Sequence, residues 1–112
     1  MEKPEDVRAQ LGLLRRLARD FRGTLQAGLD GRQGIESITH SLGIYGHNRD
    51  LYGCNTPAVQ PLRDFFRSFE KRRRMLHHVL SPSAFLLALR QELEIAEAEA
   101  VEQTEVAQAQ AA

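Results

Sequence analysis

Cysteine and tryptophan are scarce in this chain, which has one cysteine, Cys54, and no tryptophan among its 112 residues. A single cysteine cannot form an internal disulfide, which fits a reducing compartment, and we expect a cytoplasmic protein. Long apolar runs are also missing: no segment approaches 18 apolar residues, and residues 1–6 contain no apolar signal core. We therefore expect neither a signal peptide nor a membrane-spanning segment.

Signatures of metal binding and catalysis are missing too. The possible ligands are four histidines and one cysteine: His40, His47, Cys54, His77 and His78. They show neither the paired-cysteine spacing nor the His-x3-His spacing of a zinc site. Cys54 follows His47 in a glycine-rich segment, but no surrounding signature supports a nucleophile–base pair. We expect no metal, no cofactor, no small-molecule substrate and no enzymatic activity.

Charge is balanced overall but divided along the chain. All 15 Lys and Arg lie in residues 1–90 beside nine Asp and Glu, which leaves this part at +6. Residues 91–112 carry six Glu and no base, so they stand at −6. A basic body with an acidic extension indicates contact with nucleic acid or another polyanion.

Apolar residues at helical spacing predict two long helices. The first begins at Pro4 and ends near Gly28, with an inward stripe of Val7, Leu11, Leu14, Ala18, Phe21 and Leu25. The second runs from about Pro61 to Leu80, with a stripe of Leu62, Phe65, Phe66, Phe69, Leu76 and Leu80. Arg73 lies in the centre of the second stripe, where it either reaches the core edge or pairs with an acid.

Glycine is concentrated between the two long helices. There we expect a short helix from Ile35 to Leu42, with Ile35, Ile38 and Leu42 inward and Gly43 as its stop. Two similar turns, Tyr45–Asn48 and Tyr52–Asn55, should follow it. Both tyrosines should anchor this loop to the core. A helix-turn-helix over residues 38–49 is disfavoured, because its second helix would need an apolar residue near Arg49 and no glycine at position 46.

Ser81-Pro82 has the cap-then-proline pattern that begins a fourth helix. From Glu97 onward the chain contains only Ala, Glu, Gln, Val and Thr, so this segment either continues the helix or is disordered. No segment alternates with period two. The sequence predicts an all-α bundle of three to four helices over residues 1–96, with a glycine-rich central loop and a low-complexity acidic tail over residues 97–112.

The main functional signal is a row of like charge. Its members follow one another at spacings of 4, 4, 3 and 4, on one helix face: Arg63, Arg67, Lys71, Arg74 and His78. Like charges at this spacing destabilise a helix by about 0.2–0.5 kcal/mol per pair, so the row indicates an anionic partner. A second basic face lies on the first helix: Arg8, Arg15, Arg16, Arg19 and Arg22. No aromatic residue is interleaved with either row, which favours phosphate contact over base stacking.

Two functions remain open from the sequence. The first is a non-catalytic nucleic-acid-binding protein, a small subunit of a larger nucleoprotein assembly, in which the row binds RNA or DNA backbone and Arg8, Arg15, Arg19 and Arg22 assist. The second is a helical protein–protein adaptor, such as an assembly chaperone, virion component or regulator, without nucleic-acid contact. Leu86 and Leu87 widen the apolar arc of the last helix and predict a protein interface or self-association. The tail acids could also fold back on the row and compete with its partner.

Overall fold

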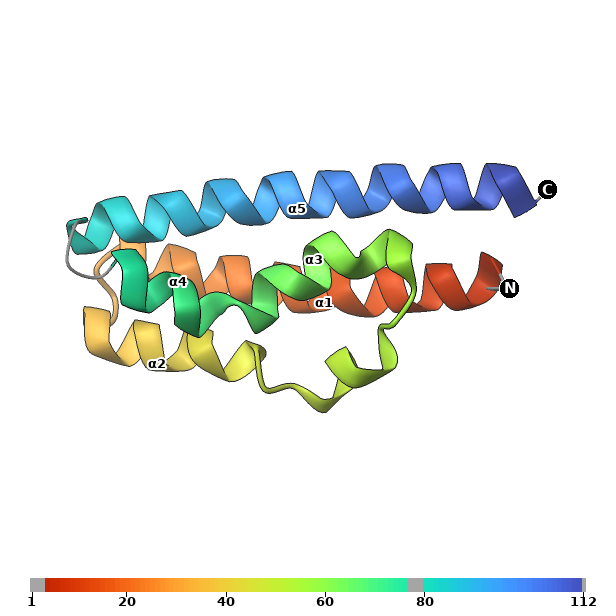
Figure 1. The fold of residues 1–112 in the computed structure, drawn as a ribbon. Coiled ribbons are helices and arrows are strands. Elements are labelled where there is room, and N and C mark those ends of the chain that lie inside the picture. The colour runs from red at the N-terminus through yellow and green to blue at the C-terminus, as the bar shows by residue number, and fades with distance from the viewer. Residues whose placement is uncertain (1–3, 77–79, 112) are drawn as a thin grey trace.

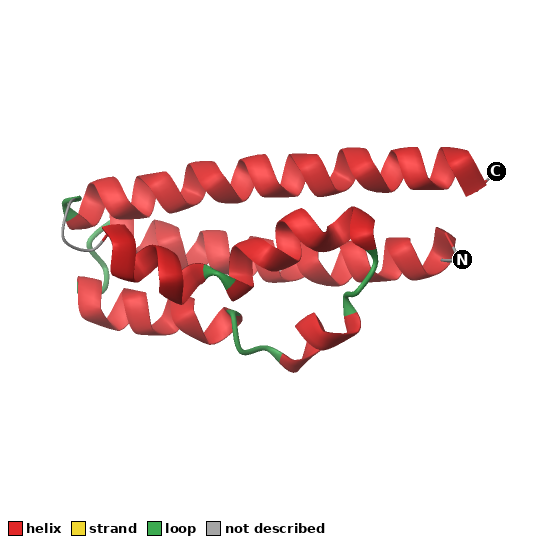
Figure 2. Cartoon of the chain, in the orientation of Figure 1, coloured by secondary structure: helices red, strands yellow, loops and turns green. Residues whose placement is uncertain are grey.

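The computed structural model describes residues 4–76 and 80–111, and all regular structure in these ranges is helical (Figures 1 and 2). The elements in order are α1 (Pro4–Leu29), α2 (Ile35–Tyr45), the 3-10 helices η1 (Arg49–Gly53) and η2 (Pro57–Val59), α3 (Gln60–Arg67), α4 (Phe69–Leu76) and α5 (Pro82–Ala111). The predicted all-α fold is confirmed. None of the described helices combines the length and the apolarity needed to cross a bilayer.

Helices α1 and α5 are the longest of the structure, and they run antiparallel along the molecule (Figure 1). The N-terminus and the C-terminus therefore lie at the same end of the molecule. Their starts follow the sequence signals. Pro4 opens α1, and the Ser81 hydroxyl accepts the Ala84 backbone N–H at 3.2 Å at the start of α5. Residues 97–111 lie within α5, which is helical from Pro82 to Ala111.

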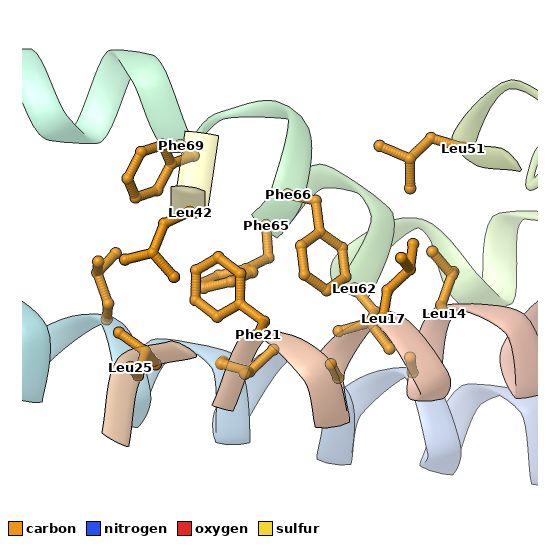
Figure 3. Packing of buried hydrophobic residues seen from close by; sticks show 14 of the residues in the cluster. Leu14, Leu17, Phe21, Leu25, Leu42, Leu51, Leu62, Phe65, Phe66 and Phe69 are labelled. Carbon is orange, nitrogen blue, oxygen red and sulfur yellow. The ribbon is translucent and has the colours of Figure 1, made fainter. Parts of the chain in front are cut away.

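Phe21 of α1 is fully buried at the centre of the core (Figure 3). Four aromatic rings pack edge-on against it, with centroid distances of 5.3 Å to Phe65, 5.6 Å to Phe66, 6.3 Å to Phe69 and 5.4 Å to Tyr45. Such pairs add about 0.5–1.5 kcal/mol each beyond the apolar area that they bury. The core therefore joins α1 to α2, α3 and α4 through one aromatic side chain.

The long helix predicted from Pro61 to Leu80 is wrong in one respect, because it is divided at Ser68 into α3 and α4. The Ser68 hydroxyl donates to the Phe65 carbonyl at 3.4 Å, and the Ser68 N–H donates to the Asp64 carbonyl at 2.9 Å. The N–H bond follows the regular helical ladder, whereas the Ser68 hydroxyl competes with the backbone for the Phe65 carbonyl. The division changes the direction of the chain in the middle of the basic row.

The short helix α2 is longer than expected, because Gly43 lies inside it and the helix ends at Tyr45, with Gly46 as its C-cap. A Cβ atom at Gly46 would lie 2.6 Å from the Phe66 carbonyl oxygen, so the missing side chain lets α2 meet the backbone of α3. Ile38 is buried as predicted, whereas Ile35 is exposed rather than inward.

Candidate nucleic-acid interface

The basic row predicted on one helix is shared between two. Arg63 and Arg67 lie on α3, Lys71 and Arg74 lie on α4, and His78 lies outside the described residues. Arg63 is half-buried, and its Nη1 donates to Gln60 Oε1 at 3.4 Å. The exposed part of the row therefore consists of Arg67, Lys71 and Arg74.

The arginines beside the exposed part are occupied by acids of the same chain. Arg72 Nη1 lies 3.0 Å from Glu92 Oε2 of α5. Arg73, expected at the core edge or beside an acid, pairs with Glu70 on its own helix: Nη2 lies 2.9 Å from Oε2, and Nε lies 3.2 Å from both oxygens. These hydrogen bonds from Arg73, with smaller Coulombic help from neighbouring cations, hold the pKa of Glu70 below its ordinary value.

By contrast, Arg67, Lys71 and Arg74 pair with no acid among the described side chains. Three cations that make no ion pair with a described acid therefore face solvent along α3 and α4. Asp64 and Glu70 lie within one helical turn of Arg67 and Arg74, but Glu70 pairs with Arg73, and neither acid makes a described ion pair with the three exposed cations.

Tyr52 brings an aromatic ring to this row, which the sequence did not indicate. Its side chain is 70% exposed, and the Arg67 guanidinium carbon lies 5.7 Å from the centre of the ring. The prediction that both tyrosines anchor the loop is thus wrong for Tyr52. Tyr45 is anchored: its ring packs against Phe21, and its hydroxyl lies 3.2 Å from Thr24 Oγ1.

The residue before Tyr52 in the sequence, Leu51, carries a signal for the exposure of Tyr52. Leu51 is apolar and buried, and adjacent side chains of a short helical turn point in different directions. A buried Leu51 therefore directs Tyr52 away from the core. The contact with Arg67 could not be found in this way, because the two residues belong to different elements.

The basic face of α1 is partly neutralised by the chain itself. Glu97 of α5 is only 16% exposed and meets two guanidiniums. Its Oε1 lies 2.6 Å from Arg22 Nη2, and its Oε2 lies 3.5 Å from Arg15 Nε. Arg8, Arg16 and Arg19 are exposed and pair with no described acid.

The two basic faces do not form one surface. Glu92 and Glu97 are five residues apart on α5, so they point about 140° apart around its axis. One meets Arg72 of α4 and the other meets the arginines of α1. Helix α5 therefore lies between the faces, and the α1 arginines do not extend the row on α3 and α4.

The idea that the tail acids fold back on the row is wrong for the described residues. Residues 97–111 continue α5 in one direction rather than turning back. Of the six acids of residues 91–112, Glu92 and Glu97 are the ones that pair with a described base, and their partners lie outside the exposed part of the row.

The predicted apolar interface is corrected at Leu86, which is 2% exposed and belongs to the core of this chain. The helix turns this side chain inward beside Phe85 and Leu89, both also buried. Leu87 is 46% exposed and keeps its place at the surface.

The surroundings of Cys54 do not activate its thiol as a nucleophile. The thiol is buried and donates to the Asp50 carbonyl at 3.4 Å. Burial raises its pKa, although the charge of Arg63 acts in the opposite direction. A thiol with a raised pKa is a poor nucleophile at neutral pH. Within residues 4–76 and 80–111, no three His, Cys, Asp or Glu side chains gather as metal ligands would.

Comparison with protein-family models, with curated proteins and with solved structures gives no significant match for this chain. Its function therefore has to be inferred from its own residues.

Proposed function

We propose that this chain binds the phosphate backbone of nucleic acid through Arg67, Lys71 and Arg74, as a non-catalytic subunit of a larger nucleoprotein assembly. The observation that supports this is the contrast within one segment. Arg72 and Arg73 are paired with Glu92 and Glu70, whereas the three exposed cations of the same segment, Arg67, Lys71 and Arg74, make no ion pair with a described acid. Phosphate supplies the missing counterions, and guanidinium groups can bind it through two parallel hydrogen bonds.

The size of the surface supports the role of a subunit. Arg67, Lys71 and Arg74 are three cations, so they can neutralise about three phosphates of a strand. Three phosphate contacts give weak binding at physiological salt. A neighbouring subunit that holds the chain near the strand would raise the effective concentration and make the contacts useful.

The test compares salt dependence of binding between matched charge variants. Fluorescence anisotropy would follow a labelled single strand and a labelled duplex across a salt series. With three phosphates neutralised, the slope of log K against log salt should be about −2 for the single strand and about −2.7 for the duplex. The variant Arg67→Glu/Lys71→Glu/Arg74→Glu should lose this binding.

The matched control reverses three exposed charges on the other face, Arg8→Glu/Arg16→Glu/Arg19→Glu, and so changes the net charge by the same amount. It should keep the binding that belongs to Arg67, Lys71 and Arg74, because helix α5 separates the two faces, and should lose only the separate contribution of the α1 arginines. Equal loss in both variants would show an effect of net charge without a site, and no binding of the wild type at low salt would refute the proposal.

A protein-binding function is the second candidate. It is favoured by three exposed apolar side chains of α5, Leu87, Ile95 and Val106, which fall within an arc of about 100° around the helix. An apolar interface of this kind would change little with salt, so binding that survives high salt in a co-purified complex would favour an adaptor.

We place the proposed activity in the cytoplasm. Cys54 is a free thiol, and reducing compartments preserve free thiols. Detection of the chain by fractionation with reduced Cys54 would test this location.

A further inference from the structure

We propose that Tyr52 is a stacking platform for one base of a single-stranded nucleic acid, with the neighbouring phosphates on Arg67 and Lys71. This inference rests on the proposed function and makes it specific, since it names the strand form that the surface selects. The support comes from the rigidity of the turn that carries Tyr52, the exposure of its ring and the position of Arg67.

The turn that carries Tyr52 is fixed at both ends. The Asn48 side chain caps η1 by accepting the Asp50 N–H at 2.8 Å. Leu51 and Cys54 are buried on either side of Tyr52, and the Cys54 N–H donates to the Leu51 carbonyl at 3.2 Å. The ring is therefore held outward by a short helix seated in the core.

The segment after this turn is fastened to the two helices beside it. Gln60 Nε2 of α3 donates to the carbonyls of Cys54 and Thr56, at 3.2 Å and 3.3 Å. Gln10 Oε1 of α1 accepts the Thr56 N–H at 3.0 Å. A binding residue on such a support loses little freedom when a ligand arrives, which favours affinity.

The ring of Tyr52 is open to a ligand. It is 70% exposed, whereas Tyr45, at the end of α2, is partly buried and packs against the core. A flat group of the size of a base can reach it.

Arg67 completes the site. Its guanidinium lies 5.7 Å from the ring centre, within the range of a cation–π contact, and it pairs with no described acid. Aromatic rings beside unpaired cations are the combination by which proteins bind single strands, since the ring stacks a base while the cations hold the backbone. In a duplex the bases are already stacked on one another, so the ring has nothing to bind.

The test compares Tyr52→Ala with Tyr52→Phe on three labelled probes. These are an oligo(dT) of about 20 nucleotides, which exceeds the usual site size, an abasic strand of equal length and a duplex of equal length. Tyr52→Ala should bind oligo(dT) about 5-fold or more weakly, and should bind the abasic strand and the duplex like the wild type. Tyr52→Phe keeps the ring and should keep the affinity.

A second readout follows the ring directly. The chain has two tyrosines and no tryptophan, so its fluorescence comes from Tyr45 and Tyr52. Stacking of a base on Tyr52 should quench this fluorescence in the wild type, and Tyr52→Phe should abolish the quenching although it still binds oligo(dT). Far-UV circular dichroism of each variant would show that the fold is intact.

The outcomes separate this inference from the proposed function. If the Arg67/Lys71/Arg74 variant loses binding and Tyr52→Ala does not, phosphate binding stands and the platform is refuted. If Tyr52→Ala loses the same factor of affinity for the abasic strand as for oligo(dT), stacking is also refuted. If the wild type binds no probe at low salt, both proposals fail.

Discussion

Replacing Glu97 by glutamine should destabilise the fold by a predictable amount. Glu97 is 16% exposed and lies between Arg15 and Arg22, with its shorter contact of 2.6 Å to Arg22 Nη2. Hydrogen bonds to charged groups contribute about 1.5–3 kcal/mol when buried, and exposed ion pairs contribute about 0.2–1 kcal/mol. The two arginines are 55% and 32% exposed, and glutamine keeps one acceptor oxygen. We therefore expect a loss of about 1 kcal/mol, or about 4 °C in Tm for a domain of this size.

The assay is urea unfolding followed by far-UV circular dichroism, with Glu105→Gln as the control. Glu105 lies on the same helix, is exposed and pairs with no described base, so its replacement should change stability by less than about 0.5 kcal/mol. Equal midpoints for Glu97→Gln and Glu105→Gln, with unchanged m-values, would refute the view that Glu97 fastens α5 to α1.

The same substitution should also change binding. It removes the single negative charge that Arg15 and Arg22 share, so the α1 face can neutralise about one further phosphate. The slope of log K against log salt for a single strand should steepen by up to about 0.7. This gain should persist in the Arg67→Glu/Lys71→Glu/Arg74→Glu variant, because the two faces lie on different sides of α5. An unchanged slope would show that the α1 face does not bind polyanions.

Two further predictions concern the core and the pH dependence of stability. Phe21→Ala removes the ring on which four others pack, and should lower the free energy of unfolding by about 3–5 kcal/mol in urea titrations; a loss below 1 kcal/mol would contradict its central role. Arg73 holds the pKa of Glu70 below its ordinary value, so Glu70 stabilises the fold above that ordinary value, and this contribution disappears as the pH falls through the lowered pKa. Glu70→Gln should therefore flatten the acid side of a stability–pH curve below about pH 4.3, and a curve like that of the wild type would show that the pair adds nothing.

Local signals account for most of the predicted fold. The starts at Pro4 and at Ser81-Pro82 depend on backbone groups within one turn, and the apolar stripe around Phe21 depends on helical periodicity. The break at Ser68 could not be predicted in this way. Its surroundings include the close approach of Gly46 to the Phe66 carbonyl, and the sequence does not show that these segments meet.

The candidate site depends even more on contacts between distant residues. The sequence shows which side chains are basic, but their availability depends on acids placed elsewhere in the chain. Arg22 is occupied by Glu97, 75 positions away, whereas Arg67 has no described acid beside it. Periodicity treats these two arginines alike, since each belongs to a basic helix face.

The position of Tyr52 shows the same limit for recognition. Within α3 and α4 the phenylalanines are taken up by the core, so a helix-by-helix reading predicts phosphate contact without stacking. The ring beside Arg67 comes instead from η1, where the burial of Leu51 forces its neighbour outward. A preference for single strands over duplexes therefore depends on one tertiary contact, that of Tyr52 in η1 with Arg67 in α3. The Tyr52 variants measure how far this contact sets the preference.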